Sequence, residues 1–151
     1  MGEPATGAAR APAQVRNVAL VGHGGSGKTS LGELLLFTAG ASKRLGRVQD
    51  GTSLLDWDPE EVRRKISVSA SLAPCTWSDH RLTFIDTPGY FDFVGEVLAA
   101  LRVADAAAVV VCCAAGVEVG TEKVWDYAGR HGLPRLVVIN KLDRENANWP
   151  R

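Results

Sequence analysis

The stretch Gly22-His23-Gly24-Gly25-Ser26-Gly27-Lys28-Thr29 decides the fold of this chain and matches the pattern GxxxxGK[ST]. Before it, residues 15–21 form an apolar run that predicts a short buried strand. After it, residues 28–37 carry leucines on one face, which predicts a helix. A loop of this composition between a strand and a helix indicates a phosphate-binding loop; a glycine-rich turn with an accidental lysine is the alternative.

The chemistry of such a loop assigns roles to its residues. The glycines let backbone N–H groups turn towards a phosphate chain, and the helix start adds a partial positive charge. We expect Lys28 to reach the β- and γ-phosphates and the Thr29 hydroxyl to ligate Mg²⁺. The other expected nucleotide contacts in the loop are Gly22, His23, Gly24, Gly25, Ser26 and Gly27.

A second motif, Asp86-Thr87-Pro88-Gly89, directly follows a predicted strand at residues 81–85. We expect Asp86 to hold Mg²⁺ through a water molecule, while the N–H of Gly89 approaches a γ-phosphate closely. Alone, such a segment is more often a simple turn. Beside a phosphate-binding loop, we favour a segment that responds to the nucleotide.

A third motif, Asn140-Lys141-Leu142-Asp143, follows a predicted strand at residues 136–139. The Asp143 carboxylate can accept two hydrogen bonds from the N1–H and N2–H₂ groups of guanine. Adenine offers no such pair of donors, so these residues argue against a P-loop ATPase. We expect Asn140 to brace the loop and Lys141 to cover the base. Taken alone, a helix cap with charged neighbours explains the motif equally well.

The remaining pattern predicts an α/β fold of three layers. Residues 41–65 show no period and predict a functional or mobile loop. Residues 66–72 alternate between apolar and polar side chains and predict a half-exposed edge strand. Ser78-Asp79-His80 predicts the turn of a hairpin. Helices are expected at residues 94–103 and 121–131, and a buried strand at 106–114. This order predicts a mostly parallel sheet with one antiparallel edge strand and a ligand site beyond the carboxyl ends of its strands.

Composition narrows the class of protein. The 151 residues suit one domain, and 17 basic against 17 acidic residues give no footprint for direct DNA binding. The three cysteines lack metal-ligand spacing, which favours a reducing compartment, the cytoplasm. Residues 1–14 are rich in Ala, Pro and Gly and predict a disordered leader, and the apolar run 106–115 is too short for a membrane span.

From residue 15 to about residue 143, the chain resembles the G domain of elongation factor G and its paralogues. The resemblance implies a P-loop GTPase fold, GTP or GDP with Mg²⁺ as ligands, and the ribosome as partner of the full-length protein. It also makes Ser67 the expected third Mg²⁺ ligand, in place of the family's switch threonine. Besides the three motifs, it rests on Leu45-Gly46-Arg47-Val48, Asp92-Phe93-Val94, Arg102-Val103-Ala104-Asp105-Ala106-Ala107, Gly116-Val117-Glu118-Val119 and Thr121-Glu122-Lys123-Val124-Trp125.

Three departures from the family pattern bear on activity. Tyr90 stands where the best-known members have a histidine, and its neutral phenol can hold a water molecule but cannot become a cation. Gly25 replaces an aspartate that helps to hold a monovalent cation, and Ser67 replaces threonine. With Tyr90, Lys28 and Gly89 as the catalytic candidates, we expect slow hydrolysis; a nucleotide-dependent binding module with little turnover is the alternative.

These departures suggest the type 2 group of elongation factor G-like paralogues. G domains of the tetracycline-resistance, release-factor-3 and back-translocase types remain open alternatives. The family's G domains also have a later Ser-Ala segment that contacts guanine, and no such segment follows Asp143 here. We therefore expect an incomplete, C-terminally truncated G domain over residues 15–151, with weak GTPase activity by itself.

Overall fold

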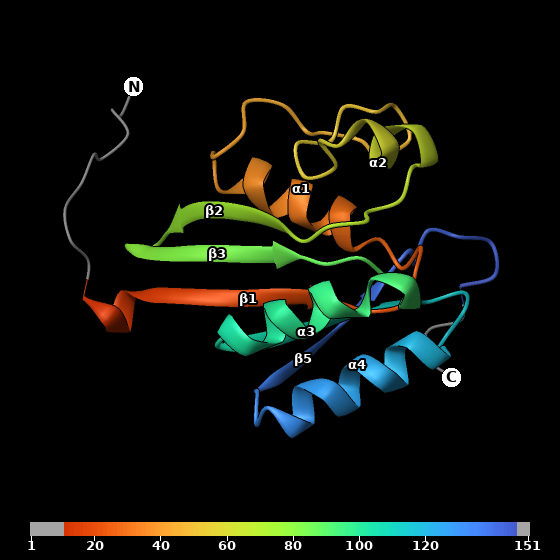
Figure 1. Cartoon of the computed structure of the whole chain (residues 1–151). Helices are drawn as coiled ribbons and strands as arrows, with labels where there is room; N and C mark the ends of the chain where they lie inside the picture. Colours follow the sequence, from red (N-terminus) through yellow and green to blue (C-terminus); the bar gives the residue numbers. More distant parts are fainter. Residues whose placement is uncertain (1–10, 148–151) are drawn as a thin grey trace.

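A computed structural model of the chain describes residues 11–147, which contain one five-stranded sheet in the order β2-β3-β1-β4-β5 (Figure 1). The pairs β1–β3, β1–β4 and β4–β5 are parallel, and β2 runs antiparallel to β3 at one edge. The predicted fold class, a mostly parallel sheet with one antiparallel edge strand, is confirmed. The strands are β1 Val15–Val21, β2 Ser71–Trp77, β3 His80–Asp86, β4 Ala106–Cys112 and β5 Arg135–Asn140.

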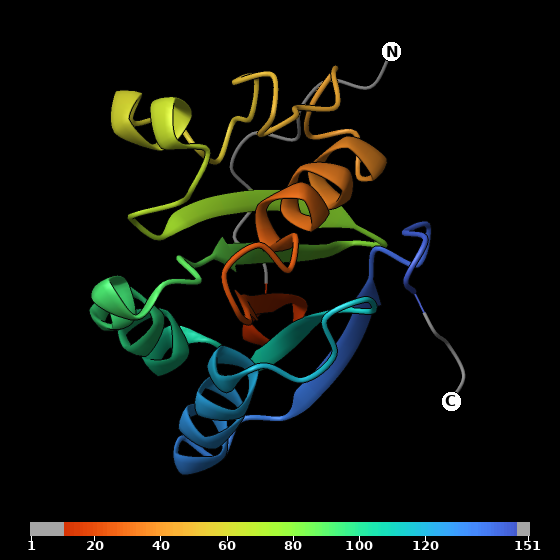
Figure 2. The same cartoon turned by 90° about the vertical axis from the view of Figure 1, so that its right-hand side faces the viewer.

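Helices cover both faces of the sheet (Figure 2). Helix α1, Lys28–Thr38, packs on one face against β1, β2 and β3. Helices α3, Val94–Val103, and α4, Val119–Arg130, pack on the opposite face. Two 3-10 helices, η1 at Pro12–Gln14 and η2 at Phe91–Phe93, lie before β1 and α3. All loops that carry the three sequence motifs leave the sheet at the carboxyl ends of parallel strands, where ligands of such sheets bind.

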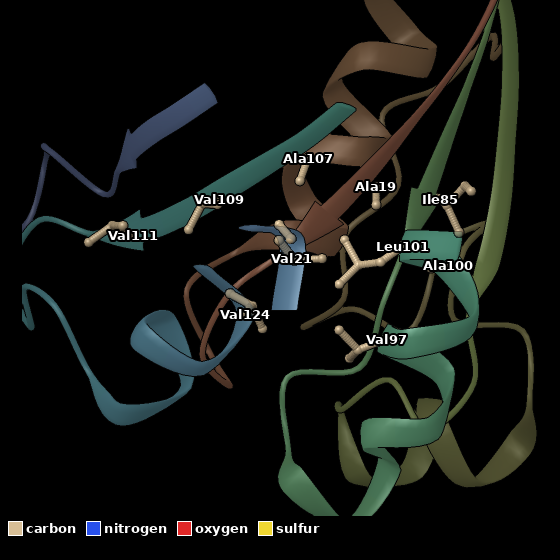
Figure 3. Close-up of a cluster of buried hydrophobic side chains, with 11 residues drawn as sticks. Ala19, Val21, Ile85, Val97, Ala100, Leu101, Ala107, Val109, Val111 and Val124 are labelled. Atoms are coloured by element: carbon tan, nitrogen blue, oxygen red, sulfur yellow. The ribbon is translucent and has the colours of Figure 1, made fainter. Parts of the chain in front are cut away.

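The main apolar core lies between the sheet and helices α3 and α4 (Figure 3). Alternate residues of β1 and β4 point into it, and the residues between them, Leu20, Ala108 and Val110, are also buried. These strands are therefore apolar on both faces, as buried parallel strands are. Leu101 of α3 is 1% exposed and lies at the centre of this cluster. Its buried members are Ala19, Val21, Ile85, Val97, Ala100, Leu101, Ala107, Val109, Val111, Val124 and Ala128.

The predicted edge strand at residues 66–72 is wrong in position, because β2 begins only at Ser71. The backbone N–H groups of Val68 and Ser69 donate to the Glu61 carboxylate at 2.9 and 3.1 Å, and that of Ala70 donates to Glu96 at 2.8 Å. Side-chain carboxylates therefore take the bonds that a strand would make, although the residues alternate in polarity. The hairpin prediction is confirmed: β2 and β3 join through a turn in which Ser78 and Asp79 have φ of 45° and 64°.

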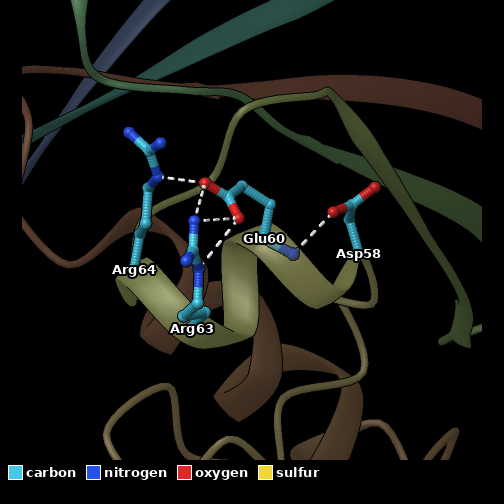
Figure 4. A network of polar contacts seen from close by, with 4 residues as sticks. All are labelled: Asp58, Glu60, Arg63 and Arg64. Atoms are coloured by element: carbon cyan, nitrogen blue, oxygen red, sulfur yellow. Dashed lines mark hydrogen bonds and ion pairs between the residues drawn. The ribbon is translucent and has the colours of Figure 1, made fainter.

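The loop predicted at residues 41–65 contains a helix, α2, Pro59–Arg64. Asp58 precedes it and accepts a hydrogen bond from the N–H of Glu60 at 2.7 Å, while Pro59 supplies a fixed φ for the first turn. Glu60 also pairs with Arg63 and Arg64 on the exposed face of the helix (Figure 4). These start signals were present in the sequence, but a helix of six residues is too short to show a hydrophobic period.

The other predicted elements are found with small shifts at their ends. The predicted leader, residues 1–14, falls mainly outside the described residues, and its last three form η1. Within the part of the chain that is described, no helix has the length and apolar character needed to cross a bilayer.

Candidate functional site

The glycine-rich loop connects β1 to α1, and Lys28, the first residue of the helix, folds back beneath it. Its side chain is only 5% exposed, and Nζ donates to the carbonyl oxygens of Gly22 and His23, both at 3.0 Å. Burial lowers the pKa of Lys28 to about 8, although the nearby Asp86 acts in the opposite direction. An ammonium group with so little solvent is stabilised by an anion placed next to it.

Asp86 ends β3 directly behind this loop and is 1% exposed. Neither of its carboxylate oxygens makes a hydrogen bond to the described residues. Burial raises the pKa of Asp86 to about 7, and the nearby Thr29 hydroxyl and Lys28 ammonium act against that effect. A buried carboxylate without partners requires an explanation, and a divalent cation or its bound water is one that suits the chemistry.

Two hydroxyl groups and a second carboxylate lie near Asp86. Thr29 Oγ1 and Ser67 Oγ are 3.1 Å apart, although 38 residues separate them in the sequence. Ser67 Oγ also donates to Asp56 Oδ1 at 2.7 Å, and Asp56 is 3% exposed. Hard oxygen ligands of this kind suit Mg²⁺, so the residues present fit the ion that the sequence motifs imply.

The segment after β3 lies against the glycine-rich loop. A Cβ atom added to Gly89 would lie 2.5 Å from Lys28 Nζ and 2.6 Å from the backbone nitrogen of Gly24, so only glycine fits there. The Tyr90 ring packs on Gly24, where an added Cβ atom would meet the ring at 3.1 Å. Tyr90 is nevertheless 45% exposed, so its ring stands at the mouth of the site.

The loop after β5 is tied to the same glycine-rich loop. Asn140 Nδ2 donates to the carbonyl oxygen of Ser26 at 2.9 Å, and Asn140 Oδ1 accepts from the N–H of Lys141 at 2.8 Å. The Lys141 ammonium donates to the carbonyl oxygen of Gly25 at 2.5 Å. Asp143 is exposed, three residues beyond Asn140. The structure thus joins the first and third motifs through side-chain to backbone hydrogen bonds.

An open cleft of about 360 Å³ lies between these three loops, within the size range of small-molecule sites. Nine of the predicted site residues line it: Gly24, Gly25, Gly27, Lys28, Thr29, Ser67, Gly89, Tyr90 and Lys141. Six others do not: Gly22, His23, Ser26, Asp86, Asn140 and Asp143. Of these, Ser26 and Asp86 are buried behind the lining. His23 Nε2 lies 3.5 Å from Oε1 of Glu118, the residue before α4.

Sequence reasoning did not single out several residues that line the cleft. Asp56, Lys65 and Ile66 come from the segment before β2, whose sequence shows no period. Two signals pointed to them: the length of that segment, since long loops in compact domains are often functional, and the position of Lys65 and Ile66 directly before Ser67. The others are Ser30, Gln49 and Arg144, together with Val48 and Thr87, which stand in quoted motifs but were given no role in the site.

Comparison with known proteins places this geometry among translation factors. Residues 13–151 match the family model of the elongation factor Tu GTP binding domain. The chain is 44% identical over 134 residues to elongation factor G 2 of Streptomyces coelicolor and 41% identical over 138 residues to elongation factor G 2 of Syntrophus aciditrophicus. These matches cover 89% and 91% of the chain but only 20% of each relative, so the chain spans about a fifth of their length.

Solved structures give the same likeness in three dimensions. A crystal structure of a protein from Thermus thermophilus matches with a TM-score of 0.84 and 53% identity, over 87% of this chain and 20% of that one. A bacterial selenocysteine-specific elongation factor matches with a TM-score of 0.68 and 26% identity, over 85% of this chain and 20% of that one.

Proposed function

The chain belongs to the family of the elongation factor Tu GTP-binding domain, and from this premise we propose that it binds GTP and GDP with Mg²⁺ and hydrolyses GTP. It would do so as the G domain of a cytoplasmic, ribosome-associated protein of the elongation factor G type. The single observation that carries this proposal is the convergence of three loops on one cleft, held by the Asn140–Ser26 hydrogen bond and by the close packing of Gly89 on Gly24.

Different residues around the cleft would bind the phosphates and the Mg²⁺ ion. Lys28, now bonded to two backbone carbonyls, would turn its ammonium towards the β- and γ-phosphates, whose charge replaces those contacts. Thr29 and Ser67 would hold Mg²⁺ through their hydroxyls, and Asp86 would hold it through water. The bound ion would neutralise charge on the phosphates, while the N–H of Gly89 would face the γ-phosphate.

Recognition of the base would come from the loop after β5. The Asp143 carboxylate would accept the two donors of guanine, and the stem of Lys141 would cover the ring. Asn140 supports this role by fixing the start of the loop to Ser26. Exposure of Asp143 is consistent with a carboxylate that becomes covered only when the base binds.

Tyr90 would orient the attacking water through its phenolic O–H. Because phosphoryl transfer depends mainly on positioning and electrostatics, a neutral phenol predicts slower hydrolysis than a group that can carry positive charge. The packing of the ring on Gly24 favours a second candidate function, a nucleotide-dependent binding module with little turnover. In that case Tyr90 would be a packing residue only.

Nucleotide titration tests the binding proposal. GTP and GDP should bind in an Mg²⁺-dependent manner while ATP competes weakly, and equal affinity for ATP would contradict the guanine assignment. Phosphate release with and without ribosomes then separates the two candidates. Release that increases with ribosomes supports the GTPase, whereas intact GTP binding with no release in either condition supports the binding module.

A further inference from the structure

We propose that Glu33, in the second turn of α1, is a positioning residue that holds residues 46–56 so that Asp56 and Ser67 stand at the metal-binding position beside Thr29. Glu33 itself does not line the cleft. This proposal rests on the proposed Mg²⁺-nucleotide site, and it assigns to Glu33 a part in that site which no sequence motif indicates.

The Glu33 carboxylate is fully buried, with 0% of the residue exposed, and its partners all come from one segment. Oε1 accepts from the N–H groups of Leu54 and Leu55 at 2.5 and 3.1 Å and from Ser53 Oγ at 2.9 Å. Oε2 accepts from the N–H of Gly46 at 3.2 Å. Bonds from neutral donors to a charged group are stronger than those between neutral groups, and removing the acceptor leaves buried donors unsatisfied.

Glu33 has no salt bridge to any residue between 11 and 147. The donors of residues 46–55 are therefore the main compensation for taking this carboxylate out of water. The dependence is mutual: the segment contains no helix or strand of its own, and four of its polar hydrogens end on this one side chain. The fold of the segment thus depends on Glu33.

Close packing fixes where the segment lies. A Cβ atom on Gly46 would collide with Glu33 Oε2, so the backbone can approach the carboxylate only because this residue is glycine. Leu55, 3% exposed, packs on Gly32 of α1, where an added Cβ atom would be 2.6 Å from its Cδ1. The segment therefore lies directly on the helix.

Two side-chain contacts connect the packing of Leu55 on Gly32 to the metal-binding position. Asp56 follows Leu55, and its Oδ1 accepts from Ser67 Oγ at 2.7 Å. Ser67 Oγ lies 3.1 Å from Thr29 Oγ1. Thr29 and Glu33 are four residues apart in α1 and therefore share one face of the helix. One helix face thus contacts residues 46–55 at Glu33 and Ser67 at Thr29. Release at Glu33 would therefore move Asp56, and with it Ser67, away from Thr29.

The test compares Glu33→Gln with wild type and with Glu122→Gln, a matched change at an exposed position of α4. The first readout needs no nucleotide: hydrogen exchange at the amides of Leu54 and Leu55. We expect Glu33→Gln to increase exchange there by about tenfold or more, the size of one charge-assisted hydrogen bond, while the Glu122→Gln variant stays at the wild-type rate. Unchanged exchange in Glu33→Gln would overturn the proposal.

The second readout separates positioning from general stability. The Mg²⁺ concentration that gives half-maximal GTP binding should rise by about tenfold in Glu33→Gln, while GTP affinity in EDTA stays unchanged. Equal weakening with and without Mg²⁺ would show a general structural role and overturn the proposal. If wild type binds no GTP, the proposed function fails, yet the exchange readout still decides whether Glu33 holds the segment.

A milder variant covers the case in which Glu33→Gln does not fold, as judged by circular dichroism. Gly46→Ala keeps the carboxylate, but its Cβ atom would meet both Glu33 Oε2 and, at 2.8 Å, the carbonyl oxygen of Thr52, so the backbone at residue 46 must move. The Gly46→Ala variant should increase amide exchange at Leu54 by about threefold or more. It should also raise the Mg²⁺ concentration for half-maximal GTP binding by about threefold or more. Wild-type values for both quantities would contradict the role of Glu33.

Discussion

Replacing Lys28 by methionine is expected to stabilise the nucleotide-free protein while abolishing GTP binding. Methionine fills a similar volume without the charge, and Lys28 is 5% exposed. Burial lowers the pKa of Lys28 from 10.5 to about 8. At about 1.4 kcal/mol per pH unit, the folded state therefore disfavours the charged form by about 3 kcal/mol.

Removing the ammonium group also removes its hydrogen bonds, and this loss offsets part of the gain in stability of Lys28→Met. Lys28 Nζ donates to the carbonyl oxygens of Gly22 and His23, both at 3.0 Å. At about 1 kcal/mol for each bond, the variant loses about 2 kcal/mol. The free energy of unfolding at pH 7 should therefore rise by about 1 kcal/mol in Lys28→Met.

The pH dependence of this difference provides a sharper check. Because the pKa of Lys28 is lower in the folded than in the unfolded state, the unfolded state binds more protons between about pH 8 and pH 10.5. The stability of the wild type therefore rises through this window relative to the variant, and the advantage of Lys28→Met disappears. Below pH 8 the penalty is fully present in the wild type.

Urea unfolding followed by circular dichroism, at several pH values between 7 and 10 without nucleotide, measures this difference. Titration with a fluorescent GTP analogue measures the loss of binding. A Lys28→Met variant that is less stable than wild type at pH 7, by a difference that does not change up to pH 10, would refute the cost assigned to burying the Lys28 ammonium.

Three further predictions concern the base, the reaction and the core. Asp143→Asn should shift nucleotide preference from guanine towards xanthine, since an amide donates where the carboxylate accepts; competition between GTP and xanthosine triphosphate measures this, and an unchanged preference would remove the guanine assignment. Tyr90→Phe should lower ribosome-stimulated phosphate release by about tenfold with GTP affinity retained, because only the phenolic O–H is lost; equal rates would make Tyr90 a packing residue. Leu101→Ala should lower the free energy of unfolding by about 2–5 kcal/mol, because Leu101 is 1% exposed in the main core; a loss below about 1 kcal/mol in urea unfolding would mean that the core is not packed as described.

Much of the fold followed from local patterns in the sequence. The apolar runs that became β1, β4 and β5 are flanked by helices whose periods are clear, and the hairpin turn carries residues that tolerate positive φ. The pattern failed between residues 41 and 72, where it predicted a loop and a misplaced strand. In this stretch, backbone N–H groups donate to side-chain carboxylates such as those of Glu33 and Glu61. No local rule of sequence predicts which carboxylate a backbone group many residues away will contact.

By itself, the sequence determined which three loops gather and in what order, because each motif is a local piece of chemistry placed directly after a strand of a parallel sheet. Only the tertiary structure decided that Lys28 is buried against backbone carbonyls, that Tyr90 packs on Gly24, and that Asp56 reaches the Thr29–Ser67 pair. These features arise from contacts between residues distant in the chain. Burial and charge at such contacts depend on the whole packed fold, which spacing along the sequence does not encode.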